Sequence, residues 1–231
     1  MLSPLLRGIE MKSFLSRVFS PLLVSPLFAS SLVALTPCAF AENDTVFLDL
    51  AAGSEMSHYR LGLGETSRGA EGERVTSMFY LGYMETDDTY KFENTNLGKK
   101  KFEMLTLGVG GFGYLENHEQ YGGAEFDFEI SNTFSDEVDY DRLAIGMRAQ
   151  LFIPIVAGLQ ANMGVNLRPF FLAEDWDETA NLEYEYQGGL EYAFSQDIAV
   201  YSHYRYLGAY LKNDDKLTMA ESVLFGLRAR F

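Results

Sequence analysis

Apolar and polar side chains alternate along most of the chain after its first forty residues. Between Gly123 and Ile130 the apolar side chains occupy even positions and the acidic ones odd positions. The stretch Arg142–Leu151 alternates in the same way, with its apolar residues at odd positions. A period of two residues is typical of β-strands with one apolar face. These stretches reach about ten residues, whereas strands of soluble sandwiches average about five or six and membrane-crossing strands need about 9–11.

The alternation predicts an antiparallel transmembrane β-barrel of about ten strands, an all-β fold. A change of apolar parity at Gly110–Gly111 predicts a β-bulge there. The predicted strands are 45–53, 57–65, 73–86, 100–115, 119–131, 140–153, 156–172, 180–194, 197–211 and 218–231.

Two kinds of connection alternate between these strands. Acid-rich connections cover 54–56, 87–98, 132–139, 173–179 and 212–216, and mostly shorter ones cover 65–72, 116–118, 154–155 and 195–196. Outer-membrane barrels have long outer loops and short periplasmic turns. Both termini would then lie in the periplasm, which requires an even strand count. Ten strands satisfy this, and eight are the alternative if the first two strands lie outside the barrel.

The first 41 residues predict a cleavable signal peptide. Lys12 and Arg17 precede an apolar stretch that closes on Ala39–Ala41, a small-x-small cleavage pattern. Met11 is an alternative start, because Met11–Lys12 opens the positively charged region. Pro37 directly precedes Cys38, which argues against a lipoprotein signal. The predicted organisation is therefore a signal peptide over 1–41 and a single barrel domain over 42–231.

The charge balance of the chain is strongly acidic. There are 18 Lys and Arg against 33 Asp and Glu, a net charge of -15. Cleavage after Ala41 leaves 190 residues with 15 basic and 32 acidic side chains and no cysteine. This composition excludes a nucleic-acid binder, which needs clustered Lys and Arg. It also means that no disulfide stabilises the mature fold.

The C-terminal residues carry a specific pattern. Phe225, Leu227 and Phe231 lie on one apolar face of the last strand, and the final residue is aromatic. This is similar to the terminal strand by which outer-membrane barrels are recognised by their assembly machinery. We therefore expect the barrel assembly machinery as a partner and an outer-membrane location in a Gram-negative bacterium.

The second half of the chain resembles the YfaZ-like proteins, a family of small Gram-negative outer-membrane proteins without an assigned activity. The matching residues are Pro169–Leu172, Tyr184–Tyr186, Val200–Tyr201 with Tyr204–Arg205, and the terminal Gly226–Phe231, with a weaker match at Leu81–Tyr83. Residues 87–140 match poorly. The resemblance implies a location and a fold, and it implies no catalytic residues.

The positions that alternate with the apolar ones carry many charged residues. If the apolar positions face lipid, these charged residues face the barrel interior. Neighbouring antiparallel strands would pair Glu125 with Arg148 and Glu129 with Arg142. A barrel of this size is expected to be filled by side chains or to leave a very narrow pore. The predicted lumen network is Asp49, Arg60, Glu125, Asp127, Glu129, Arg142, Arg148, Arg168, Glu183, Glu185, Arg205 and Arg228, with Glu191 beside it.

Catalytic and metal-binding patterns are weak in this sequence. The segment Tyr201–Arg205 loosely resembles the His-x-Ser segment of barrel lipid A deacylases, but Arg205 stands where the Ser would be. Ser202 has the opposite parity to His203, so a Ser–His pair is not expected. The spacing of His58, His118 and His203 does not fit a zinc site, and we expect no bound cofactor.

Acidic residues of the predicted outer loops suggest a surface role. Carboxylates there could be bridged to lipopolysaccharide phosphates by Ca²⁺ or Mg²⁺, although solvated loop charge explains them as well. The residues are Asp136, Glu137, Asp139, Glu174, Asp175, Asp177, Asp214 and Asp215.

Together these patterns predict a monomeric, non-catalytic barrel with a structural or surface-interaction role. Its partners would be outer-membrane lipid and lipopolysaccharide. The alternative is a narrow porin-like channel for small solutes or ions, and a third, weaker alternative is a lipid-modifying enzyme.

Overall fold

The computed structural model describes residues 44–68, 73–93, 95–117, 120–138, 140–174, 180–195, 197–212 and 215–231. The predicted signal peptide therefore lies outside the described residues. Within these ranges the chain forms ten strands and one short 3₁₀ helix. Their bounds are β1 Asp44–Gly53, β2 Met56–Arg68, β3 Glu73–Phe92, β4 Thr95–Asn117, β5 Gln120–Ser135, β6 Tyr140–Val156, β7 Leu159–Pro169, η1 Phe170–Leu172, β8 Ala180–Ala193, β9 Ile198–Leu211 and β10 Lys216–Arg230.

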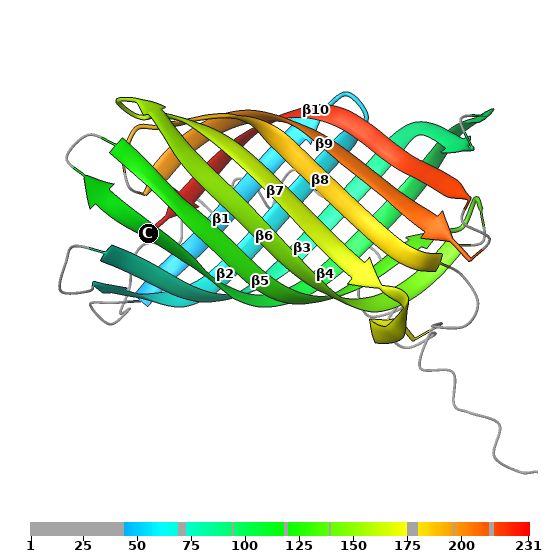
Figure 1. Ribbon diagram of the computed structural model, residues 1–231, viewed down its shortest axis with the longest axis horizontal. Coiled ribbons are helices and arrows are strands. Elements are labelled where there is room, and N and C mark those ends of the chain that lie inside the picture. The colour runs from blue at the N-terminus through cyan, green and yellow to red at the C-terminus, as the bar shows by residue number, and fades with distance from the viewer. Residues whose placement is uncertain are drawn as a thin grey trace, which may run out of the picture. The chain divides into compact units, whose positions relative to one another are not determined.

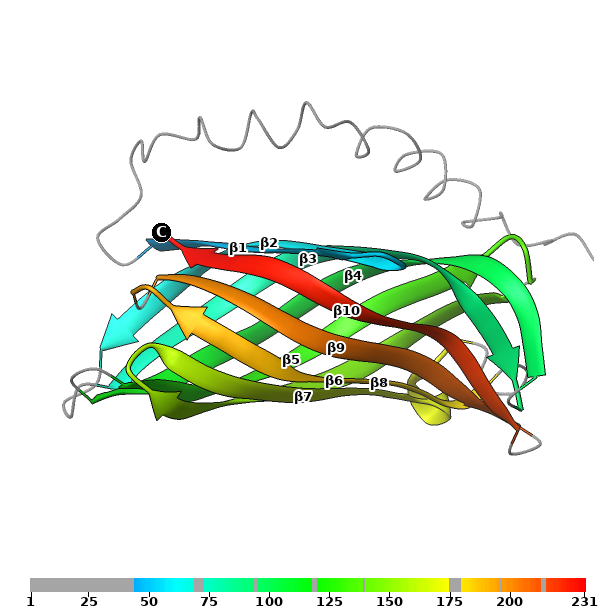
Figure 2. The ribbon, with the colours of Figure 1, turned by 90° about the horizontal axis from the view of Figure 1, so that it is seen from above.

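The ten strands close into an antiparallel barrel (Figure 1). Each strand pairs with the next along the chain, and β1 pairs with β10 over seven residue pairs, from Phe47–Arg230 to Gly53–Leu224. The two strands lie side by side in both views (Figure 2). The prediction of a ten-stranded barrel is confirmed, and the eight-stranded alternative is wrong because β1 and β2 belong to the closed wall.

Several predicted connections are wrong because the strands run beyond them. The segment 87–98 is mostly strand: β3 and β4 continue to pair up to Phe92–Thr95. The strand β5 likewise extends to Ser135, inside the predicted loop 132–139. The turn predicted at 154–155 lies later, at Gly158, whose φ of +74° favours glycine. Charged or proline residues do not end these strands, since the neighbouring strand still supplies hydrogen-bond partners.

The predicted bulge at Gly110–Gly111 is also wrong. The pairing of β4 with β3 and β5 runs through both glycines without a register shift. Phe112 points inward and is buried, while Val109 points outward. The parity change in the sequence arises because apolar side chains occupy both faces of β4 near its end, and the backbone stays regular.

The two faces of the barrel wall have opposite character. Large apolar side chains cover the outside, for example Phe126, Phe128 and Ile130 on β5, which are 47–51% exposed. The alternating residues Asp127 and Glu129 are inside and at most 4% exposed. Among the described residues, no helix is long and apolar enough to cross a membrane.

The barrel wall is uneven at one end. β1 and β2 meet in a short turn at residues 54–55, whereas the β3–β4 hairpin extends well past it. Above that turn β3 pairs directly with β10, through Leu217–Phe92 and Thr218–Lys91. The long hairpin thus completes the wall where β1 and β2 have ended.

Candidate functional site

Charged side chains fill the middle of the barrel. Seven arginines and eight carboxylates are buried among the described residues. Each residue of the predicted lumen network lies inside and is at most 5% exposed, and so is Glu191. Since isolated buried charges are costly, their partners decide whether this arrangement is stable.

Arg168 on β7 joins two carboxylates. Its Nη2 lies 2.7 Å from an oxygen of Glu129, and its Nη1 lies 2.9 Å from Glu183. Glu183 also accepts a hydrogen bond from the Tyr140 hydroxyl at 3.1 Å and lies 3.5 Å from Arg142. One guanidinium thus bridges carboxylates from β5 and β8.

Arg60 on β2 forms a second junction. Its Nη2 lies 2.7 Å from Asp49 and its Nη1 lies 2.8 Å from Glu125. Asp49 also accepts a hydrogen bond from the Tyr201 hydroxyl. The guanidinium carbon lies 5.0 Å from the centre of the Phe47 ring, so the cation also contacts an aromatic face.

The predicted cross-strand pairs are only partly formed. Glu125 and Arg148 lie 3.8 Å apart. The pairing of Glu129 with Arg142 is wrong, because the register places Glu129 opposite Gly146 and Arg142 opposite Thr133. Gly146 carries no side chain, and a Cβ there would lie 2.9 Å from Cγ of Arg168. The space above Gly146 lets Arg168 reach across to Glu129 instead.

Two further ion pairs complete the network near β9 and β10. Arg205 lies 2.8 Å from Glu185, and Arg228 lies 2.8 Å from Glu191. The charges of the barrel middle are therefore largely compensated by direct contacts between strands.

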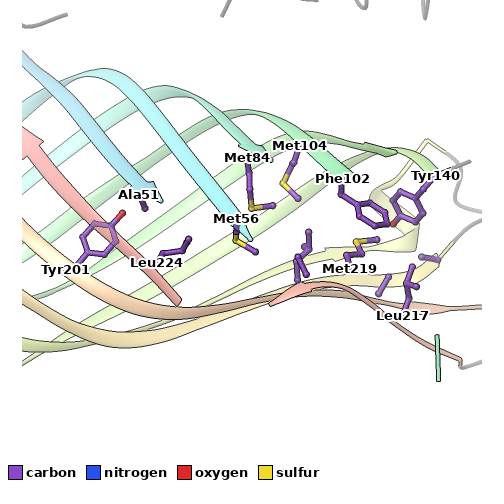
Figure 3. Close-up of a cluster of buried hydrophobic side chains, with 14 residues drawn as sticks. Ala51, Met56, Met84, Phe102, Met104, Tyr140, Tyr201, Leu217, Met219 and Leu224 are labelled. Carbon is purple, nitrogen blue, oxygen red and sulfur yellow. The ribbon is translucent and has the colours of Figure 1, made fainter. Parts of the chain in front are cut away.

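An apolar layer fills the lumen at the hairpin end of the barrel (Figure 3). Its methionines Met56, Met84, Met104 and Met219 are at most 3% exposed. Phe102 packs edge-on against Tyr140, with ring centres 6.0 Å apart. Sequence reasoning missed this layer. The available signal was the series of apolar residues at inward positions of β3, β4 and β10.

Aromatic rings and arginines fill the opposite end. The rings of Phe112 and Phe152 meet edge to face at 5.2 Å. The Arg230 guanidinium lies 3.9 Å from the Phe112 ring centre, and that of Arg228 lies 4.9 Å from Phe152. Cavities of about 20 Å³ and 10 Å³ lie in the described lumen, each about the space of one water molecule. Buried side chains thus occupy the hairpin end, the middle and the opposite end of the described lumen.

The histidines do not form a catalytic arrangement among the described residues. His203 is buried and stacks on the Tyr201 ring at 4.8 Å. Neither of its ring nitrogens has a hydrogen-bond partner in the described part of the chain. Ser202 lies on the other face of β9, and His118 lies outside the described residues. No group of three or more His, Cys, Asp or Glu side chains in the described ranges could hold a metal ion.

The acidic loop residues are only partly described. Asp139, Asp175, Asp177 and Asp214 lie outside the described residues. Asp136, Glu137 and Glu174 are exposed, and Glu137 lies 3.6 Å from Lys100. The Asp215 carboxyl shares a hydrogen bond with Glu93, which raises the pKa of Glu93. Two loop carboxyls from different hairpins thus meet at the hairpin end of the barrel.

The three residues of the predicted assembly signal lie on the outer face. Phe225, Leu227 and Phe231 are 67%, 37% and 69% exposed. They form an apolar stripe at the end of β10, beside β1.

Comparisons with known proteins give structural similarity only. No family model matches the chain, and no curated protein matches it. The NanC porin is 13% identical, with 80% of this chain and 98% of that chain covered and a TM-score of 0.36. The transport unit of the autotransporter AIDA-I from Escherichia coli is 11% identical, with 89% of this chain and 96% of that chain covered and a TM-score of 0.35. The KdgM porin is 8% identical, with 81% of this chain and 99% of that chain covered and a TM-score of 0.32. Similarity at this level carries no information about activity.

Proposed function

We propose that this chain is an outer-membrane β-barrel. Its outer face is apolar and its interior is charged, the reverse of a soluble protein. An apolar exterior that alternates with a polar interior fits a barrel surrounded by lipid. Closing the sheet also leaves no unpaired strand edge in the lipid, where an unsatisfied backbone group is costly.

The role of this barrel is exerted at its surface and not through its lumen. The observation that carries this proposal is the filled lumen, with an apolar layer, a compensated charge network and an aromatic end following one another. A barrel filled by side chains fits small strand numbers, whereas water-filled porins have about sixteen or more. A structural or interaction role without catalysis is consistent with the separation of Ser202 from His203.

Single-channel recording in planar bilayers tests this proposal. The inserted barrel is expected to show no steady openings, because ions would have to displace buried, ion-paired side chains. The porin-like alternative predicts steady openings that change with Arg148→Gln and not with the outward-facing Ala149→Ser. Heat-modifiable migration on a detergent gel verifies that each variant is folded, so silence cannot be attributed to an unfolded sample.

The acidic outer loops are proposed to bind Ca²⁺ or Mg²⁺ that bridges them to lipopolysaccharide phosphates. The carboxyls of Glu93 and Asp215 support this, because two adjacent carboxyls offer oxygen ligands to a divalent cation. Calcium titration calorimetry should show binding that weakens about tenfold in Glu93→Gln/Asp215→Asn, since two ligand charges are lost. Glu65→Gln, an exposed carboxylate on β2 outside these loops, serves as the control. Absence of calcium heat, or equal heat in the double variant, contradicts the proposal.

Membership of the YfaZ-like family, recognition by the barrel assembly machinery and a monomeric state remain parts of this proposal. The exposed apolar stripe at the end of β10 supports recognition by the barrel assembly machinery. The partners on the cell surface are identified only by chemistry, as lipid and phosphorylated glycolipid.

A further inference from the structure

Two methionines and a histidine lie side by side where the apolar layer meets the charged network. Met84 on β3 is the register partner of His58 on β2 and of Met104 on β4. All three side chains point inward and are at most 7% exposed. Directly opposed residues of antiparallel strands have Cβ atoms about 4.5–5.5 Å apart. The two thioethers and the imidazole therefore form one row across three strands.

A small cavity of the lumen lies at this row. Its volume is about 10 Å³, and His58, Met84 and Met104 all line it. Gly82 borders the same space, and the absence of a side chain at that inward position helps to keep it free. A space of this size holds about one water molecule, and a single metal ion is no larger. The cavity thus brings two sulfur donors and one nitrogen donor to a space that fits one ion.

The sulfur atoms of this row are placed to act as ligands. The thioethers of Met84 and Met104 lie next to each other, whereas Met219 on β10 lies further along the layer (Figure 3). The Arg168 Nη2 donates to the Met104 sulfur at 3.3 Å, so this thioether already acts as an acceptor. A thioether sulfur has two lone pairs, and the second remains for a metal ion. Methionine side chains are also flexible enough to adjust around an ion.

Four arginines also line this cavity, and their charges are compensated. Among the described residues they contact six carboxylates, each at 3.9 Å or less. Two of these carboxylates have a further arginine partner, so the numbers of cations and anions balance. A monovalent cation in the cavity therefore meets no excess of positive charge. The lining arginines are Arg60, Arg148, Arg168 and Arg205.

We propose that His58, Met84 and Met104 form a binding site for one soft monovalent metal ion, copper(I) or silver(I). Thioether sulfur is a soft ligand that selects copper(I), and imidazole nitrogen binds copper as well. Hard cations prefer carboxylate and carbonyl oxygens, and the carboxylates near this row are bound to arginines. The ion joins β2, β3 and β4 inside the closed barrel, so its binding stabilises the folded state. This inference goes beyond the surface role and does not depend on it.

Retention of silver(I) tests the proposal, because silver needs no reductant. The full chain carries Cys38→Ser, since Cys38 is the one cysteine of the sequence and a thiolate would bind silver itself. The protein is refolded with silver nitrate in a chloride-free buffer, and unbound ion is removed. We expect about one silver ion per chain, and about tenfold less in Met84→Leu/Met104→Leu, because two of the three donors are lost. Met219→Leu, in the same layer but away from the cavity, is the matched control and should retain the ion.

X-ray absorption at the silver edge provides an independent measurement. Sulfur neighbours are expected around the bound ion, and His58→Gln should remove the nitrogen neighbour while the sulfur neighbours stay. Leucine nearly conserves the volume of methionine, and heat-modifiable migration verifies that each variant is folded. A folded barrel without silver, equal retention in the double variant, loss of silver in Met219→Leu, or a bound ion without sulfur neighbours each overturn the inference. None of these results changes the proposed membrane placement, which is tested by other measurements.

Discussion

At the residue scale, the buried cations of this barrel are all arginines within the described residues. Seven arginines are buried there, and the described lysines Lys91, Lys99 and Lys101 lie at the surface. A planar guanidinium can bind two carboxylates at once, as Arg60 and Arg168 do, whereas a lysine ammonium is compact and strongly hydrated. Strand parity predicts which charges point inward. It does not predict their partners, because these depend on register, as Glu129 and Arg142 show.

Removal of one arginine should therefore destabilise the barrel strongly. Arg168→Met leaves Glu129 and Glu183 buried without their shared cation, and we expect a loss of about 3–5 kcal/mol. The free energy of unfolding in urea, measured in lipid vesicles, checks this. Lys101→Met, at an exposed ion pair, should change it by less than about 1 kcal/mol. Equal small effects of both substitutions would show that the buried network contributes little.

At the element scale, glycines make room for inward-facing tyrosines of the neighbouring strand. A Cβ at Gly108 on β4 would lie 2.2 Å from the Tyr80 ring, and one at Gly226 on β10 would lie 2.3 Å from Tyr201. Both rings thus lie against a bare stretch of the neighbouring strand. The sequence predicts the ten strands because alternation is local. It does not predict the length of the β3–β4 hairpin, since that depends on contact with β10.

Substitution of one of these glycines should disturb the wall between β3 and β4. Gly108→Ala displaces the Tyr80 ring, whose hydroxyl donates to Glu129 at 3.3 Å, and overpacking of this kind costs about 1–3 kcal/mol. Gly111→Ala on the same strand meets only an ordinary contact, 3.4 Å from the Thr76 carbonyl oxygen. Urea unfolding midpoints of the two variants should differ clearly. Coinciding midpoints would mean that the Tyr80 ring moves without cost.

At the scale of the whole barrel, the lumen is built of three successive layers. The sequence predicts the charged middle layer, because Arg and Glu stand out at inward positions. It does not predict the methionine layer, since an apolar residue at an inward position looks like an imperfection of the pattern. Only the closed barrel brings Met56, Met84 and Met219 together from three strands. The filled lumen and the apolar exterior are thus properties of the assembled sheet.

The central claim is that the apolar face of this barrel contacts lipid while the other face is shielded from it. Single tryptophans test it, placed in a Trp176→Phe background because Trp176 is the only tryptophan of the sequence. Phe128→Trp reports the outer face, where Phe128 is 51% exposed, and Phe152→Trp reports the lumen, where Phe152 is 3% exposed. In vesicles of brominated lipid, we predict strong fluorescence quenching for Phe128→Trp and little for Phe152→Trp. Equal quenching of both, or quenching of neither, would contradict the account.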